Sequence, residues 1–155
     1  MADQDLVERF YQAFAKKDAE AMAACYADEA EFSDPAFPHL NADEVRGMWR
    51  MLCGRSQDLR IEYVSRQTSL GCYQVDWQAW YTFTKTGRPV HNRVQASLQL
   101  KNGKIVHHQD RFNFWRWSRQ AFGLPGWILG WTPILRKAVQ AEAGKALQTF
   151  LKKRA

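Results

Sequence analysis

The sequence predicts a single α+β domain, and two patterns along the chain carry that prediction. Apolar residues recur at helical spacing in the N-terminal part, and from residue 59 the period changes to two, as in strands with one buried face. The helices therefore come before the strands as a block, whereas βαβ proteins alternate them. Asn102-Gly103 adds the strongest signal for a β-hairpin in the chain.

Three helices are predicted in the N-terminal part, over residues 3–17, 18–26 and 41–53. Each starts at a side chain that can accept hydrogen bonds from free backbone N–H groups, and Glu44 completes a capping box with Asn41. The first helix would bury a face formed by Leu6, Val7, Phe10, Ala13 and Phe14. A short acidic strand over residues 29–33 precedes the third helix, which Gly54 is expected to end.

A four-stranded antiparallel meander is predicted over residues 59–117. Its second strand alternates most clearly, with one face formed by Tyr73, Val75, Trp77, Ala79, Tyr81 and Phe83. The third strand spans residues 90–101, and a fourth strand over residues 105–117 completes the hairpin. We expect the short acidic strand at the side of this sheet.

Composition limits the classes of function. The chain has 155 residues, 46% of them apolar, and a formal net charge of +6. Basic and aromatic residues alternate over residues 111–119, but a strand explains that spacing without a nucleic-acid partner. Three widely spaced cysteines favour neither a disulfide framework nor a metal site, and make a reducing cytoplasm the expected location. We find no Gly-rich phosphate loop, no signal peptide and no membrane-spanning run, and we expect no cofactor.

The dipeptide Asp34-Pro35 is the first candidate for chemistry. Pro35 fixes its own φ and holds Asp34 in an extended backbone, with Phe32 and Phe37 on either side. A carboxyl group among apolar neighbours has a raised pKa, which suits a general base near neutral pH. The alternative is an ordinary turn after a strand, because Asp and Pro are common turn residues.

The order of these motifs resembles the nuclear-transport-factor-2-like superfamily, and more narrowly its SnoaL-like and ketosteroid-isomerase-like branch. The resemblance covers about residues 5–117 and is strongest from Val7 through Tyr26-Ala-Asp-Glu-Ala to Asp34-Pro35. It implies a cone-shaped fold, with three N-terminal helices packed on a curved antiparallel sheet, and an extra C-terminal helix. The superfamily includes isomerases, cyclases, hydrolases and non-catalytic binders, so the fold alone does not name a reaction.

Only some of the functional residues of ketosteroid isomerases have a counterpart in this sequence. Asp34 falls where ketosteroid isomerases have their general base. Their oxyanion hole uses a tyrosine and a protonated aspartate, and the corresponding positions here are Phe10 and Ser97, with Tyr11 one residue away. The resemblance therefore does not imply steroid isomerisation.

The predicted hairpin offers a second group of polar residues. A two-residue turn at Asn102-Gly103 pairs Ser97 with His108, Gln95 with Asp110, and Arg93 with Phe112. We expect this face to point into the cone, because a core face without function should be apolar. Asp110 is also similar in position to an acid/base aspartate of SnoaL-like cyclases.

These observations lead to a hypothesis of cofactor-free acid–base chemistry on a small apolar substrate. Asp34 would be the base, and Asp110 with His108 its partner. The other predicted pocket residues are Phe10, Trp49, Trp77, Tyr81, Arg93, Gln95, Ser97 and Phe112. Isomerisation, cyclisation and hydrolytic ring-opening are all consistent with it. Two alternatives stay open: Asp110 is neutralised by Arg93 or Gln95, or the pocket binds a hydrophobic metabolite or a protein partner without catalysis.

Residues 119–155 are expected to form a unit beyond the cone of residues 1–118. A loop rich in Gly and Trp leads to Thr132-Pro133, a helix start, and the helix runs to about Lys152. The loop contains Trp127, Ile128, Leu129 and Trp131. These side chains could form a lid, a dimer contact or a membrane-surface element. We favour packing on the cone or on a second copy of the chain, in a homodimer formed across the outer sheet face.

Overall fold

The computed structural model describes residues 2–154. Its helices are α1 (Ala2–Ala15), α2 (Ala19–Ala23), α3 (Ala42–Arg55), α4 (Phe114–Phe122), α5 (Leu124–Leu129) and α6 (Pro133–Arg154). Its strands are β1 (Tyr26–Ser33), β2 (Leu40–Asn41), β3 (Arg60–Ser69), β4 (Cys72–Phe83), β5 (Arg88–Lys101) and β6 (Lys104–Arg111). The strands form one sheet in the order β2-β1-β6-β5-β4-β3.

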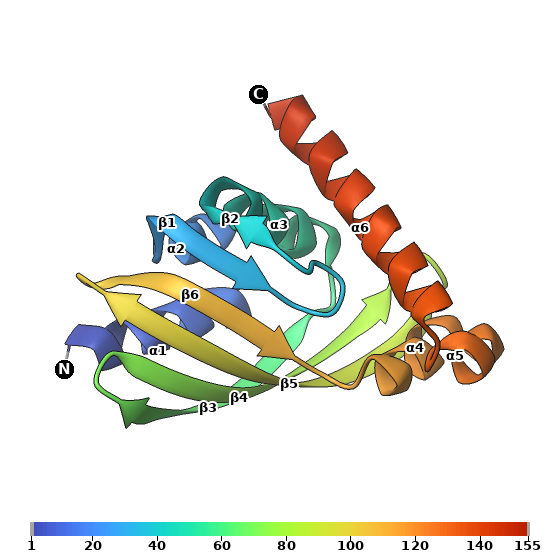
Figure 1. The fold of residues 1–155 in the computed structure, drawn as a ribbon, viewed down its shortest axis with the longest axis horizontal. Helices are drawn as coiled ribbons and strands as arrows, with labels where there is room; N and C mark the ends of the chain where they lie inside the picture. Colours follow the sequence, from blue (N-terminus) through green and yellow to red (C-terminus); the bar gives the residue numbers. More distant parts are fainter. Residues whose placement is uncertain (1, 155) are drawn as a thin grey trace.

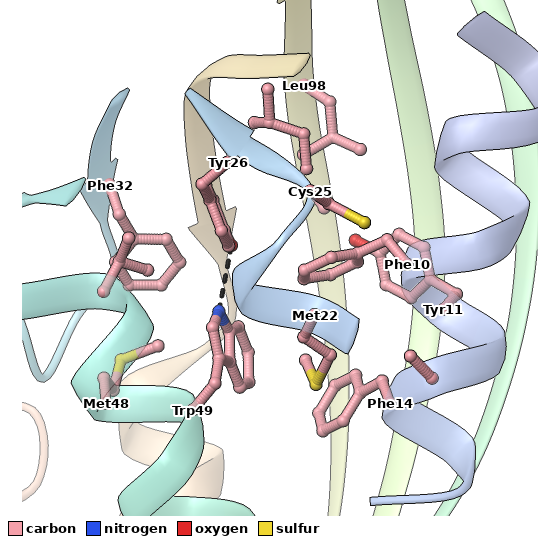
Figure 2. Close-up of a cluster of buried hydrophobic side chains, with 14 of the residues drawn as sticks. Phe10, Tyr11, Phe14, Met22, Cys25, Tyr26, Phe32, Met48, Trp49 and Leu98 are labelled. Atoms are coloured by element: carbon pink, nitrogen blue, oxygen red, sulfur yellow. Dashed lines mark hydrogen bonds between the residues drawn. The ribbon is translucent and has the colours of Figure 1, made fainter. Parts of the chain in front are cut away.

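The sheet is curved, and helices α1, α2 and α3 cover its concave side, which confirms the predicted α+β cone (Figure 1). Two of the three predicted caps formed: Asp18 accepts from the backbone N–H of Ala21, and Asn41 and Glu44 form a capping box. Asp3, predicted to cap the first helix, lies within the first turn of α1 instead. Helix α3 ends at Arg55 rather than at Gly54, which lies within its last turn. The core fills the space between these helices and the sheet, and aromatic rings from α1, β1 and α3 meet in it (Figure 2).

The Asn102-Gly103 hairpin is confirmed, and both turn residues have positive φ, 53° and 73°. The predicted register holds only next to the turn, where Lys101 pairs with Lys104 and Leu100 with Ile105. A β-bulge at Val106 then shifts the pairing by one residue, so that Gln99 pairs with His107. Ile105 and Val106 are consequently both buried.

The bulge corrects the three predicted cross-strand pairs. The observed partners are Leu98 with His108, Ser97 with Gln109, and Ala96 with Asp110. Arg93, Gln95 and Ser97 point to the exposed outer face of the sheet. His108 and Asp110 point to the inner face as expected, but beside apolar residues of β5 rather than polar ones.

Strand β1 lies beside β6 and runs parallel to it. The register shifts between Tyr26 and Glu31, and beyond the shift Phe32 pairs with His108. Tyr26 belongs to this strand, not to the helix predicted for it. The edge strand β2 pairs with the end of β1 through Glu31–Asn41 and Phe32–Leu40. This arrangement places Asp34, directly after β1, near the end of β6 that carries Asp110.

The chain leaves the sheet earlier than the sequence predicted. Strand β6 ends at Arg111, and residues that were expected to extend it form α4 instead, capped by Asn113. The boundary predicted at residue 118 falls inside this helix. Part of the predicted Gly-Trp loop is also helical, as α5, and α6 leads from there past α3 to the C-terminus (Figure 1). No helix within residues 2–154 is long and apolar enough to cross a membrane.

Candidate active site

A cavity of about 360 Å³ opens between the inner face of the sheet, α3, α4 and α6. Its walls are mostly apolar and aromatic, with Trp49 from α3, Trp77 from β4 and Trp117 from α4 among them. Helix α6 contributes Val139, Ala143 and Ala146. A pocket of this size and lining suits a small apolar molecule. The carboxyl groups of Asp34 and Asp110 both line it.

Asp34 is held by the turn that Pro35 begins. Its Oδ1 accepts hydrogen bonds from the backbone N–H groups of Ala36 (2.7 Å) and Phe37 (2.6 Å), and its own N–H donates to the carbonyl of Phe37 (2.8 Å). Within residues 2–154, Oδ2 of Asp34 has no such partner. One oxygen is therefore fixed, while the other is available to a molecule in the cavity.

Burial raises the pKa of Asp34 from its ordinary value to about 7. The two backbone N–H groups oppose this shift because they favour the carboxylate, whereas the negative charge of Asp110 adds to it. The shift places this carboxyl near the pKa that a general base needs at neutral pH.

Tyr81 brings a hydroxyl group to the wall of the same cavity. Its oxygen accepts a hydrogen bond from Nε1–H of Trp117 (2.9 Å), so its own proton remains available for another acceptor. Burial raises the pKa of Tyr81 to about 12, and the nearby charge of Asp34 contributes to the rise. Tyr81 therefore stays protonated at neutral pH and can act as a hydrogen-bond donor in the cavity.

Asp110 is anchored from behind by a chain of buried hydrogen bonds. Nε1–H of Trp49 donates to the hydroxyl of Tyr26 (2.9 Å; Figure 2), and that hydroxyl lies 2.7 Å from Nδ1 of His108. Nε2 of His108 is 2.9 Å from Oδ1 of Asp110. Nε1–H of Trp77 reaches the same carboxylate oxygen at 3.5 Å.

The direction of these bonds fixes the tautomer of His108. An ionised carboxylate oxygen only accepts, so Nε2 of a neutral His108 carries the proton and donates it to Asp110. Nδ1 is then the acceptor for the hydroxyl proton of Tyr26, and the oxygen of Tyr26 accepts from the indole N–H of Trp49. The ring is almost fully buried, at 2% exposed, and packs edge-on against Phe10 and Phe32. His108 thus orients Asp110 and does not reach the cavity.

The structure places the predicted site residues in three groups. Those that line the cavity are Asp34, Asp110, Trp49, Trp77, Tyr81 and Phe112. His108 and Phe10 lie behind the wall, and Phe10 has no exposed surface. Arg93, Gln95 and Ser97 are wrong as pocket residues, because they alternate along β5 with the buried Val94, Ala96 and Leu98 and so lie on the outer face. Arg93 pairs with Gln78 there and does not neutralise Asp110.

Several residues of the site were missed by the sequence analysis. Asn92 lines the cavity between Val90 and Val94, where alternation along β5 could have placed it. Tyr26 was assigned to a helix, so its link to His108 could not be foreseen. Trp117 was assigned to a strand, and the contributions of α6 had no local signal. No group of three His, Cys, Asp or Glu side chains suited to a metal ion lies together within residues 2–154.

Comparison with known proteins identifies the fold and the family. The family model of the SnoaL-like domain matches residues 7–108. A nuclear-transport-factor-2-like protein of unknown function from Burkholderia pseudomallei is 18% identical, covering 79% of this chain and 98% of its own, with a TM-score of 0.67. No curated protein matches the sequence.

Two further structures are named for activities. A proposed polyketide cyclase from Silicibacter sp. is 14% identical, covering 77% of this chain and 95% of its own, with a TM-score of 0.69. An epoxide hydrolase from M. tuberculosis is 15% identical, covering 83% of this chain and 96% of its own, with a TM-score of 0.63. At these identities the likeness shows the nuclear-transport-factor-2-like fold alone.

Proposed function

This chain belongs to the SnoaL-like domain family, and on that basis we propose that it is a cofactor-free acid–base enzyme acting on a small apolar molecule. The observation that carries the proposal is the meeting of two carboxyl groups, Asp34 and Asp110, in one mostly apolar cavity. A cavity that only bound a neutral apolar molecule would gain nothing from a second carboxyl group that makes the first harder to ionise.

Asp34 is the proposed general base. With a pKa of about 7 it is ionised in a large fraction of molecules at neutral pH, yet it remains basic enough to take a proton. Its free oxygen would accept a proton from an acidic C–H group or from a water molecule, while the turn after Pro35 holds the other oxygen. Isomerisation and cyclisation begin with removal of a proton from carbon, and hydrolytic ring-opening begins with removal of a proton from water.

Tyr81 and Asp110 are the proposed partners of Asp34. The hydroxyl proton of Tyr81 would donate to the substrate oxygen on which negative charge develops. Asp110 is held by His108 and Trp77. It would orient a polar group of the substrate, or exchange a proton with the substrate at a point away from Asp34. His108 is a positioning residue in this scheme, because it contacts Asp110 and not the cavity.

The experiment is a screen that does not require the natural substrate. Small cyclic ketones and enones are incubated with the protein in D2O, and NMR follows deuterium uptake at carbon; small epoxides are followed for diol formation. We expect wild-type protein to catalyse one of these conversions and Asp34→Asn to lose it by at least about a hundredfold. The Asn side chain keeps an oxygen for the Ala36 and Phe37 N–H groups, so the variant should fold.

Tyr81→Phe is the second variant, expected to lower the rate by roughly 10- to 1000-fold. Arg93→Gln on the outer face is the control and should leave the rate unchanged. A protein that binds members of the panel tightly in the cavity, with no conversion of any of them, would contradict the proposal and favour a non-catalytic binder.

A further inference from the structure

A cluster of large apolar side chains is exposed on α5 and at the start of α6. Its members are Leu124 (70% exposed), Trp127 (53%), Ile128 (58%), Trp131 (73%) and Ile134 (72%). The sequence led us to favour packing of this segment on the cone or on a second copy of the chain, but within residues 2–154 more than half of each of these side chains stays exposed. Large contiguous apolar surfaces on soluble domains mark sites of contact with another molecule.

The packing of α5 against α4 determines which side of α5 is exposed. Gly126 and Gly130 lie one helical turn apart on the opposite side of α5, and both are pressed against Ser118 of α4, where a Cβ atom on either would overlap it. Gly130 keeps helical dihedrals, with φ −65° and ψ −20°, so the helical spacing continues to Trp131. Leu124, Trp127, Ile128 and Trp131 therefore follow the i, i+3, i+4, i+7 pattern of one outward helix face.

The charged residues of the segment that carries the cluster have one sign. Residues 111–141 contain no Asp or Glu, and their cations are Arg111, Arg116, Arg119, Arg136 and Lys137. The guanidinium of Arg119 lies between the rings of Trp115 (4.2 Å) and Trp127 (4.4 Å). Within the described residues its Nε has no hydrogen-bond partner, and no carboxylate pairs with it. That Nε is buried and does not itself face a ligand, so Arg119 contributes its uncompensated positive charge to this segment.

We infer that α5 and the first turn of α6 are a membrane-surface element that binds anionic phospholipid bilayers. Exposed Trp side chains and aliphatic residues suit the boundary between headgroups and acyl chains, and the surrounding cations suit anionic headgroups. A second copy of the chain fits less well on this face, because a two-fold contact would bring the five cations of each copy together without a carboxylate from the same segment.

The basic C-terminal end of α6 is not part of this element. Helix α6 has 22 residues, so its terminal cations lie about 30 Å from the exposed cluster. Lys152→Gln/Lys153→Gln is therefore a charge control for Arg136→Gln/Lys137→Gln. Likewise Val64 and Leu70, which are exposed on β3 and the turn after it, provide an apolar control.

The test is co-sedimentation of the full chain with vesicles. We expect binding to phosphatidylcholine vesicles with about 30% phosphatidylglycerol, much less to phosphatidylcholine alone, and weakening with added salt. Ile128→Ser/Trp131→Ser should lower the partition coefficient at least about tenfold, and Arg136→Gln/Lys137→Gln about fivefold for each cation removed. The two control variants and Asp34→Asn should bind as wild type does, so the outcome is independent of the catalytic proposal.

Three results would overturn the inference. One is no binding to anionic vesicles at low salt. Another is equal loss of binding in Val64→Ser/Leu70→Ser, which would point to unspecific adhesion. The third is that Ile128→Ser/Trp131→Ser converts a dimer into a monomer without changing vesicle binding, which would make this face a contact between copies of the chain.

Discussion

The carboxyl group of Asp34 is subject to two opposing influences. Apolar surroundings and the charge of Asp110 raise its pKa, while the N–H groups of Ala36 and Phe37 lower it. The first influence is larger, so the folded protein holds a proton on Asp34 over a pH range in which the unfolded chain has released it. Burial of Asp34 therefore lowers the free energy of unfolding at the pH values where its carboxyl group must ionise, as is common for catalytic groups.

This conflict predicts a pH-dependent gain in stability for Asp34→Asn. Between about pH 4 and pH 7 the native state binds more protons than the unfolded state, so wild-type stability falls as pH rises through this window. Asp34→Asn has no carboxyl group at this position, so its stability does not fall in this way as pH rises. Its advantage in free energy of unfolding should grow by about 2 kcal/mol from pH 4.5 to pH 8, after discounting the shift for relaxation. Urea denaturation at the two pH values measures it.

Asp58→Asn is the matched control. Hydrogen bonds from Thr82 lower the pKa of Asp58, so its contribution to stability is lost only below its ordinary titration range. Its effect on the free energy of unfolding should thus be the same at pH 4.5 and pH 8. A constant effect of Asp34→Asn across the same range would show that Asp34 ionises like a solvated carboxyl.

Tyr26 supports the site through a single hydroxyl group. Tyr26→Phe would leave the indole N–H of Trp49 and Nδ1 of His108 without their shared partner in the core, at a cost of about 2–3 kcal/mol. Tyr73→Phe, also buried but with no hydrogen bond from its hydroxyl within residues 2–154, should cost less than about 0.5 kcal/mol. Urea denaturation compares the two.

The imidazole of His108 gives a second measurement on the same variant. Nitrogen-15 NMR should show the proton on Nε2 in the wild-type protein, and a changed tautomer balance in Tyr26→Phe because Nδ1 loses its donor. A wild-type ring protonated on Nδ1 alone would contradict the hydrogen-bond directions assigned to this chain.

Most secondary-structure elements could be predicted because their signals are local. Caps at Asp18 and Asn41, period-two alternation in β4 and the Asn102-Gly103 turn each depend on a few neighbouring residues. The Val106 bulge could not be predicted from the sequence, because both Ile105 and Val106 are apolar and either could occupy the inner face. Helix α4 was missed because its alternating basic and aromatic residues also match a strand.

The same limit applies to the candidate site. Asp34 and Asp110 were found from their sequence context, and the cavity brings them together. Arg93, Gln95 and Ser97 were misplaced because a register counted from a turn carries every later bulge as an error of one residue. The cavity walls formed by α4 and α6 depend on how segments far apart in the sequence pack together. No residue spacing in the sequence indicates such contacts.

The contact between α4 and α5 depends on the absence of a side chain at Gly126. A Cβ atom there would overlap the backbone carbonyl of Ser118, so Gly126→Ala should separate the two helices and cost about 1–3 kcal/mol. Gly144→Ala, in α6 with open space around it, should instead stabilise by up to about 1 kcal/mol. Thermal unfolding of both variants tests the prediction; equal effects would mean that α5 is not tightly packed.

At the scale of the whole molecule, the outer face of the sheet stays the predicted site of homodimerisation. It carries a stacked group in which Arg60 lies over the ring of Trp80 (4.0 Å) and His91 packs against the same ring (4.5 Å). A planar group of this kind suits the centre of an interface.

We expect sedimentation velocity to show a dimer in the micromolar range, and Trp80→Asp to convert it to a monomer. Arg9→Glu, a charge change on the exposed side of α1, should leave the dimer intact. A monomeric wild-type protein at tens of micromolar would contradict the prediction.

The bulge at Val106 has a consequence for how such a pocket can change. Val106 is the additional residue of β6, so deleting it would leave Ile105 opposite Leu100, His107 opposite Gln99 and His108 opposite Leu98. His108 and Asp110 would still point inward. A lineage, or a protein engineer, could therefore shorten and straighten this strand while keeping the polar side chains of the cavity in place.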